Sequence, residues 1–344
     1  MQRFPLAVQN AYSDLLDRLL DDAIVEVGGT PVQRTVRGRR YWYARSYVGS
    51  EEKEKYLGPD TAELRARFER LRQEIVGLRE RAQRRRPLVE MLRVKGAPRI
   101  DAATGKVLLA LARAGVFRLR GVLVGTHAFR LYPLILGVAM PEAHHATEDI
   151  DLAQFREISV ALDDQADPKV QEALAQVGEL TPAASLYPAQ PTGFRVADTV
   201  VEILTPNRGP ERDQPVALPA RGVDAKPLRF LDFLLAEAMP AAVPYRYGAL
   251  VNVPQPARYA VHKLIIAPRR AATALAKARK DVEQATALIR VLAEDQPDEL
   301  TRVYHEAGRR GAHWRRALTR GANRMTPEVK QMLDAVLAEA NADA

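Results

Sequence analysis

The sequence contains no cysteine, which excludes disulfide bonds, thiol catalysis and zinc held by cysteine. It also has no stretch near the roughly 20 apolar residues that a membrane-spanning helix requires. Residues 1–22 carry acidic side chains where a signal peptide would have a long apolar run. These absences predict a cytoplasmic protein of a reducing compartment, without membrane contact.

Positive charge, by contrast, is abundant and unevenly distributed. The 344 residues have a formal net charge of +8. Residues 65–99 contain twelve Arg and Lys against four Glu, and residues 258–320 contain fourteen basic against seven acidic residues. Clustered positive charge attracts polyanions by counterion release and long-range steering. The pattern favours contact with nucleic acid, although arginine-rich proteins without such a role share this composition.

Domains usually contain about 100–200 residues, so this chain is expected to form two or three. Its patterning separates a helical and hairpin basic arm (residues 1–98), a core of alternating helices and strands (99–250) and a helical C-terminal domain (251–344). The predicted fold class is α/β. A small mixed sheet forms the core, and an N-terminal helix-hairpin-helix arm precedes it.

Periodic apolar residues define the arm. Spacings of four and three predict an amphipathic helix with a stripe of Val8, Tyr12, Leu15 and Leu19. The aromatic and β-branched segment 32–48 predicts a hairpin that turns at Gly38. A helix follows Pro59, and its apolar repeat forms one continuous seam of Leu64, Phe68, Leu71, Ile75 and Leu78.

Helices and strands alternate in the core, where Thr104 is expected to cap the first helix. The later region is helical from Pro256 onward. The expected strands cover residues 121–125, 148–155 and 193–206, and the expected helices cover residues 126–136, 168–178, 256–266 and 272–292.

Two carboxylates share one face of the strand over residues 148–155. Residues two apart in a strand point the same way, so Asp149 and Asp151 lie together while Ile150 and Leu152 enter the core. Neighbouring carboxylates repel each other and are costly to desolvate unless a cation lies between them. Oxygen ligands of this kind suit Mg²⁺ or Mn²⁺. Acid pairs are also common on exposed strand edges, so this pair alone does not establish a metal site.

A third acid is expected to hold a second metal ion or to activate an attacking hydroxyl. Glu202 is the candidate, because Val201 and Ile203 place it in a strand. Asp198 has the same parity and is the second choice. The histidines of the loop before the acid pair, His144 and His145, are more typical of surface than of a metal site.

Gly125 and Thr126 end a strand and open a helix. Glycine lets the backbone approach a phosphate closely, and free N–H groups at a helix start favour an anion. A plain helix-starting turn is the alternative. The combination is more informative than either part, because a glycine turn precedes the acid pair and a third acid lies on a separate strand.

The order GVLVGTHAF, TEDIDLAQF, VVEIL resembles the polymerase-beta-type nucleotidyltransferase superfamily. More narrowly, it is similar to bacterial uncharacterised nucleotidyltransferase-like proteins whose N-terminal region ends in YLGP, here Tyr56 to Pro59. The abortive-infection and toxin nucleotidyltransferases resemble the same core. The similarity is good over residues 115–295.

This resemblance implies roles for particular residues. Gly125 and Thr126 would contact a nucleoside triphosphate, and Asp149 and Asp151 would ligate metal. Glu202 would be the third carboxylate. Thr126 departs from the usual Gly or Ser, and Glu202 is one methylene longer than the commoner Asp.

The resemblance extends to the helical region. There it implies that a lysine meets the phosphates and that an aspartate supports it, at Lys263, Lys280 and Asp281. A solvated helix face is the alternative.

The implied reaction moves a nucleoside monophosphate from an NTP to a hydroxyl. RNA is the favoured acceptor, because stacking aromatics and basic side chains suit exposed bases and phosphates. The residues expected to bind RNA are Arg40, Trp42, Arg84, Arg85 and Arg86. Two alternatives remain: a non-catalytic nucleic-acid-binding protein with a degenerate fold, and a toxin-like enzyme that modifies a protein hydroxyl and has an antitoxin-like protein partner.

Overall fold

The first helix buries the stripe that its sequence predicts. α1 (Leu6–Val27) places Val8, Tyr12, Leu15 and Leu19 in the interior. The computed structural model describes residues 1–27, 30–48, 51–71, 77–140, 149–161, 164–207, 209–210 and 213–342.

A three-stranded antiparallel sheet follows, in the order β1 (Thr30–Val36), β2 (Arg39–Val48) and β3 (Glu51–Pro59). The first turn is at Arg37 and Gly38, both with positive φ, so the hairpin and its break are confirmed. The expected hairpin is incomplete, because residues 51–59 add a third strand. The run EEKEK has low strand propensity, but cross-strand ion pairs from Arg34 and Arg45 to Glu54 stabilise it.

Two helices replace the single seam expected after Pro59. α2 (Ala62–Leu71) and α3 (Leu78–Val94) are separate elements, and Ile75 lies outside the described residues. α3 packs on α1 instead, with Val89 and Leu92 in a small core.

The central sheet is mixed, which confirms the predicted α/β class. Its main path is β4-β5-β8-β10-β9, with β5/β8 and β8/β10 parallel and the other two pairs antiparallel. β6 pairs with β7, and β7 pairs with β8, so the strand region expected over residues 193–206 is a hairpin. These strands are β4 (Val122–Val124), β5 (Asp149–Ala153), β6 (Leu180–Pro182), β7 (Gly193–Val196), β8 (Thr199–Pro206), β9 (Val216–Leu218) and β10 (Val223–Leu228).

Short helices surround this sheet. α4 (Ala102–Arg113) is capped by Asp101, whose side chain accepts from the Thr104 N–H, so the expected cap at Thr104 is wrong by three residues. The single helix expected over residues 126–136 is two elements, α5 (Gly125–Phe129) and α6 (Tyr132–Leu136). The remaining helices here are α7 (Arg156–Ala161), α8 (Val170–Ala175) and α9 (Leu231–Leu235), with a 3-10 turn η1 (Pro219–Arg221).

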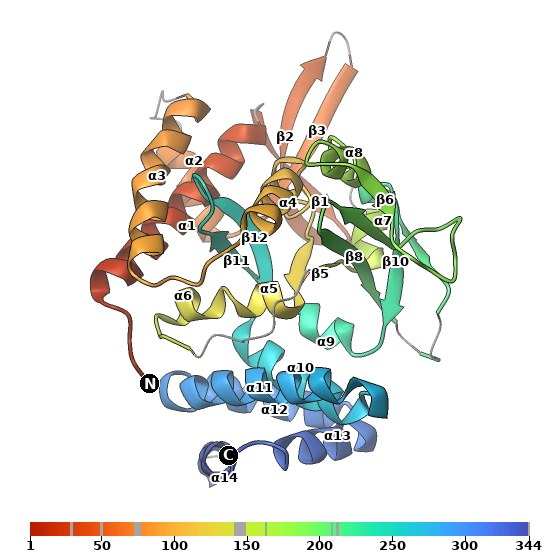
Figure 1. Ribbon diagram of the computed structural model, residues 1–344. Helices are drawn as coiled ribbons and strands as arrows, with labels where there is room; N and C mark the ends of the chain where they lie inside the picture. The colour runs from red at the N-terminus through yellow and green to blue at the C-terminus, as the bar shows by residue number, and fades with distance from the viewer. Residues whose placement is uncertain are drawn as a thin grey trace.

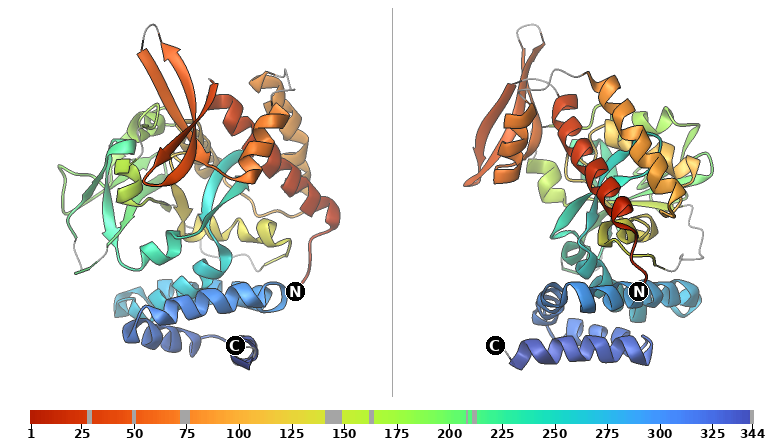
Figure 2. Two further views of the ribbon diagram at one scale, coloured as in Figure 1. Left: turned by 180° about the vertical axis from the view of Figure 1, so that it is seen from behind. Right: turned by 90° about the vertical axis from the view of Figure 1, so that its left-hand side faces the viewer.

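The sequence did not reveal the antiparallel pair of β11 (Ala238–Val243) and β12 (Ala249–Pro254). Beyond this pair, the predicted helices from Pro256 are confirmed and lie together below the core (Figures 1 and 2). They are α10 (Pro256–Ile266), η2 (Ala267–Arg269), η3 (Ala272–Ala274), α11 (Leu275–Asp295), α12 (Pro297–Arg309), α13 (Ala312–Ala322) and α14 (Pro327–Ala342).

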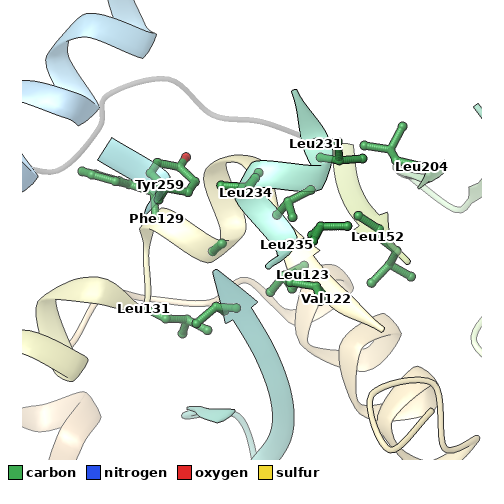
Figure 3. Packing of buried hydrophobic residues seen from close by; sticks show 14 of the residues in the cluster. Val122, Leu123, Phe129, Leu131, Leu152, Leu204, Leu231, Leu234, Leu235 and Tyr259 are labelled. Atoms are coloured by element: carbon green, nitrogen blue, oxygen red, sulfur yellow. The ribbon is translucent and has the colours of Figure 1, made fainter. Parts of the chain in front are cut away.

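One hydrophobic core extends from Val107 in α4 to Leu333 in α14, across the boundary predicted at residue 250. Figure 3 shows Tyr259 of α10 beside Phe129 of α5; their ring centroids are 6.1 Å apart. In the same view, Leu231 of α9 lies beside Leu204 of β8, and the two elements are in contact. The helical region therefore packs on α5 and α9, and these two helices contact the acid-bearing strands β5 and β8. Among the described helices, none has the length and apolar character needed to cross a membrane.

Candidate active site

Exposed and buried side chains alternate over the first residues of β5. Ile150 and Leu152 are fully buried, whereas Asp149 is exposed and Asp151 is partly exposed. The strand period thus places both carboxylates on one face, as predicted. His144 and His145 lie outside the described residues.

Strand register aligns the candidate residues across the sheet. Asp151 is opposite Val124 of β4 on one side and opposite Glu202 of β8 on the other. Gly125 directly follows Val124, so three neighbouring strands bring the glycine turn and two carboxylates into one row. Asp198 lies in the turn before β8, away from this row.

Gly125 and Asp151 occupy adjoining space. Gly125 has φ +66°, a conformation that favours glycine, and a Cβ built there would lie 2.1 Å from Oδ2 of Asp151. The turn therefore brings backbone against the carboxylate with no side chain between. The helix that follows has only five residues, so its dipole contributes less than the sequence suggested.

The electrostatic environment opposes charge on Asp151. Burial, with further contributions from Glu202 and Asp149, raises the pKa of its carboxyl to about 6. Lys263 and Lys277 act in the opposite direction but do not offset this. A carboxylate held in this way is stabilised by a cation at its side.

Tyr259 connects the helical region to the glycine turn. Its buried hydroxyl lies 2.8 Å from the Gly125 carbonyl oxygen and 2.9 Å from Oε1 of Gln284 on α11. This link fixes the backbone at Gly125 from outside the sheet. Lys263 Nζ lies over the Tyr259 ring, 5.2 Å from the ring centre, which is within cation–π range.

Lys263 of α10 and Asp281 of α11 form a buried ion pair. Lys263 Nζ donates to Asp281 at 2.5 Å, and Arg270 Nε donates to the other carboxylate oxygen at 2.8 Å. Burial alone would raise the pKa of Asp281, but Lys263 and Arg270 outweigh it and lower the pKa. Asp281 therefore supports Lys263 rather than its sequence neighbour Lys280.

Lys280 lies within electrostatic range of Asp151 and Asp281. Among the described residues it has no direct hydrogen bond or ion pair with either acid. Burial, with the positive charges of Lys263 and Arg130, lowers the pKa of Lys280. Asp151 and Asp281 act on it in the opposite sense. The structure thus gathers Lys263, Lys277 and Lys280 near Asp151, and Arg130 acts on Lys280. Thr126 is also adjacent, with its side chain largely buried.

Sequence reasoning missed Tyr259, Arg270 and Lys277 as members of this site. The spacing of Tyr259 and Lys263 was the available signal, because residues four apart share a helix face. Arg270 and Lys277 had no local signal, since their partners are distant in the chain.

The acids do not form a closed metal cage. Within the described residues, no three His, Cys, Asp or Glu side chains gather closely enough to hold an ion by themselves. Mg²⁺ usually binds one or two carboxylates together with water and substrate phosphates. Asp149 and Asp151 fit that kind of site.

The three arginines of α3 that were expected to bind RNA are not all on the surface. Arg85 was expected to bind RNA, but it is 3% exposed and forms an ion pair with Asp22, so its side chain is not on the surface. Packing of α3 on α1 turns that part of the helix inward. Arg84 and Arg86 are exposed and pair along the helix with Glu80 and Glu90.

Arg40 and Trp42 are engaged within the arm. The Trp42 Nε1–H donates to Asp60 at 2.8 Å, and Arg40 pairs with the same carboxylate at 3.3 Å. The Trp42 ring packs edge-on against Phe68 at 5.1 Å. A base could stack on Trp42 only on the part of the ring that these contacts leave free.

Comparison with known families agrees with this geometry. Residues 7–66 match a domain of unknown function (DUF6788). Neither the curated proteins nor the solved structures give a match. A family described as "Nucleotidyltransferase" matches residues 102–308. This range includes β4, β5 and β8, as well as α10 and α11, which carry Lys263 and Lys280. Because that match covers more than half of the chain, the protein belongs to this nucleotidyltransferase family.

Proposed function

We propose that the protein transfers a nucleoside monophosphate from an NTP to a hydroxyl group, with Mg²⁺ or Mn²⁺ as cofactor. One observation carries this proposal: the register that places Asp151 between the end of β4 at Gly125 and Glu202 of β8. Family membership supports nucleotidyl transfer in general. The metal, the acceptor and the residue roles below are our assignments.

Asp149 and Asp151 would hold the metal ion. Their oxygens match the ligand preference of Mg²⁺, and a cation beside Asp151 would offset the burial and the neighbouring acids that raise the pKa of its carboxyl. Bound there, the ion would neutralise charge on the phosphates.

The glycine turn and the lysines would hold the triphosphate. Gly125 leaves its backbone open beside Asp151, and the Tyr259 hydroxyl keeps that backbone in place. Lys263 and Lys280 would neutralise phosphate charge, as a lysine does for an anion in a partly buried site. Asp281 and Arg270 would position Lys263.

Glu202 would accept the proton of the attacking hydroxyl. The hydroxyl oxygen forms a bond to the α-phosphorus, the bond from that phosphorus to the bridging oxygen breaks, and pyrophosphate leaves. Glu202 lies opposite Asp151, so the proton acceptor and the phosphate-binding side of the site are on adjacent strands.

RNA remains the proposed acceptor. Its support is the chain's clustered positive charge, since polyanions bind such clusters through counterion release. The internal pairing of Arg85, Arg40 and Trp42 argues against the N-terminal arm as its main binding surface.

Incubation with each α-labelled NTP, Mg²⁺ or Mn²⁺, and total RNA tests the proposal. We expect labelled RNA that depends on the metal and is absent from Asp149→Asn/Asp151→Asn protein. The matched control is Glu172→Gln/Glu179→Gln, which neutralises two exposed acids away from the row. Labelling that persists in the Asp variant, or that falls equally in the control, would contradict the assignment.

A further inference from the structure

A second group of cations surrounds Phe230, the residue just before α9. We call Arg229, Arg269, Arg316 and Arg320 the Phe230 arginine cluster. The guanidinium carbons of Arg269 and Arg229 lie 4.9 and 5.7 Å from the Phe230 ring centre. Arg316 and Arg320 are four residues apart and share a face of α13.

The cluster borders a hollow of about 420 Å³, lined by Pro268, Arg269, His313, Arg316, Ala317 and Arg320. His313 stacks on Phe230 at 6.0 Å, and its Nε2 lies 2.9 Å from Arg269 Nη1. The hollow is thus lined by three guanidinium groups and one imidazole, and Phe230 lies buried behind that imidazole. α9, η2 and α13 each contribute to it or adjoin it, and all of them pack around α10.

Among the described residues, no carboxylate pairs with the positive charges of the cluster. All four arginines are exposed, and no carboxylate of the described residues lies within 4.0 Å of their guanidinium groups. Neighbouring arginines behave differently: Arg302 pairs with Glu237, and Arg310 pairs with Asp232.

The pKa of His313 is shifted by the charges of the same arginines. Slight burial lowers the pKa of His313, and the positive charges of Arg269, Arg229, Arg316 and Arg320 lower it further. Four cations held together without acids make a site for an anion.

The cluster is separate from the candidate triphosphate site but next to it. The charges that act most on Asp151 are Glu202, Lys263, Asp149 and Lys277, none of which belongs to the cluster. Arg269 directly precedes Arg270, which binds Asp281. The helical rise places Arg269 about 10 Å beyond Lys263 along the α10–η2 axis.

We propose that the Phe230 arginine cluster binds backbone phosphates of a single-stranded RNA acceptor and directs its end toward Asp151. The acceptor role rests on the proposed function; the phosphate binding does not. Phe230 is only 5% exposed, so bases cannot stack on it, and the contacts are made by guanidinium groups to phosphates. Binding should therefore depend on charge and be indifferent to sequence.

Equilibrium binding of a fluorescent single-stranded RNA oligonucleotide, in EDTA and across a salt series, tests this proposal. We expect Arg269→Gln/Arg316→Gln/Arg320→Gln to weaken binding at least about tenfold. The slope of log affinity against log salt should fall by about 2, at roughly 0.7 per lost phosphate contact. The Lys triple variant at the same positions should retain most of the slope, because it keeps the charge.

The matched control is Arg93→Gln/Lys95→Gln/Arg99→Gln, which removes three exposed charges from α3 and the segment after it. It should bind RNA nearly as the wild type does. Equal weakening in both Gln triples, or absence of RNA binding by the wild type, would overturn the proposal.

ATP binding, measured in parallel with Mg²⁺, should be the same in wild type and the Arg269 triple. An equal loss of ATP and RNA affinity would assign the cluster to the triphosphate instead and overturn the proposal. Cluster-dependent RNA binding without any nucleotide transfer would support the phosphate site and contradict only the proposed function.

Discussion

Gly125 is the residue whose identity the candidate site restricts most strongly. Any larger side chain meets both a left-handed backbone conformation and the Asp151 carboxylate at 2.1 Å. We expect Gly125→Ala to abolish measurable NTP binding, because Asp151 must move. The φ term alone should cost about 1–2 kcal/mol of unfolding free energy. Calorimetric ATP titration and urea denaturation measure the two effects.

Gly38 provides the matched control. It has φ +76° with nothing within 4 Å of a built Cβ, so Gly38→Ala imposes the backbone strain without a clash. Its loss of stability should be similar, and its ATP affinity unchanged. If Gly125→Ala binds ATP as well as Gly38→Ala does, then the glycine turn is not part of the nucleotide site.

Glu202 and Asp198 are close in sequence but differ in position. Glu202 lies within β8, and Asp198 directly precedes that strand. Glu202 is opposite Asp151, whereas Asp198 lies in the β7–β8 turn. Glu202→Gln should reduce kcat at least about 100-fold and leave the ATP dissociation constant nearly unchanged, since its proposed work is on the attacking hydroxyl. Asp198→Asn should be close to wild type. Steady-state kinetics in which Asp198→Asn is the damaged variant would reverse the assignment.

The two partners of the ion pair between α10 and α11 differ in the number of charged groups that they bind. Asp281 has two cationic partners, and Lys263 has Asp281 as its bonded carboxylate among the described residues. Asp281→Asn leaves a buried ammonium without that partner, so we expect a loss of about 3 kcal/mol. Lys263→Met leaves Asp281 with Arg270 and should cost less. Urea denaturation of both variants decides this order, and the reverse order would contradict it.

The elements that bear the acids were predictable because their patterns are local. Alternation around Asp149 and Asp151 predicts β5, and alternation around Glu202 predicts β8. β3 was not predictable, because EEKEK resembles a solvated segment until Arg34 and Arg45 cross-strand partners are known. The Ala- and Pro-rich β11–β12 pair likewise lacks the β-branched signal of a strand.

The acids of the candidate site could be found in the sequence, but their supports could not. A D-x-D strand and a glycine turn are visible over short spans. The bond from Tyr259 to Gly125 and the pairing of Asp281 with Lys263 depend on how the helical region docks. For the same reason, Arg85 was assigned to the surface although Asp22 of α1 buries it.

At the scale of the whole molecule, two buried histidines should make stability depend on pH. Burial, aided by Arg130, lowers the pKa of His127 to about 4, and burial, aided by Lys263, lowers that of His262 to about 3. The unfolded chain takes up these protons near pH 6.5, and the folded protein does not. Stability is therefore complete above about pH 6.5 and falls as the pH drops toward 4.

Each histidine should remove about 2 kcal/mol between pH 7 and pH 5. Urea denaturation of Asp151→Asn protein measures this without the titration of that carboxyl. His127→Gln in the same background should lose about half of the pH dependence. A free energy of unfolding that is constant from pH 7 to pH 5 would show that the histidines are not held neutral.

We propose that the site formed by Gly125, Asp151 and Glu202 carries out nucleotidyl rather than phosphoryl transfer. The most direct measurement compares α-labelled with γ-labelled NTP, using RNA as acceptor. We predict that the α label enters RNA and the γ label appears in pyrophosphate in equal amounts. Both should be lost in Asp149→Asn/Asp151→Asn protein that retains the wild-type melting temperature. Transfer of the γ label to the acceptor, or equal α-label transfer by that variant, would contradict the proposed nucleotidyl transfer.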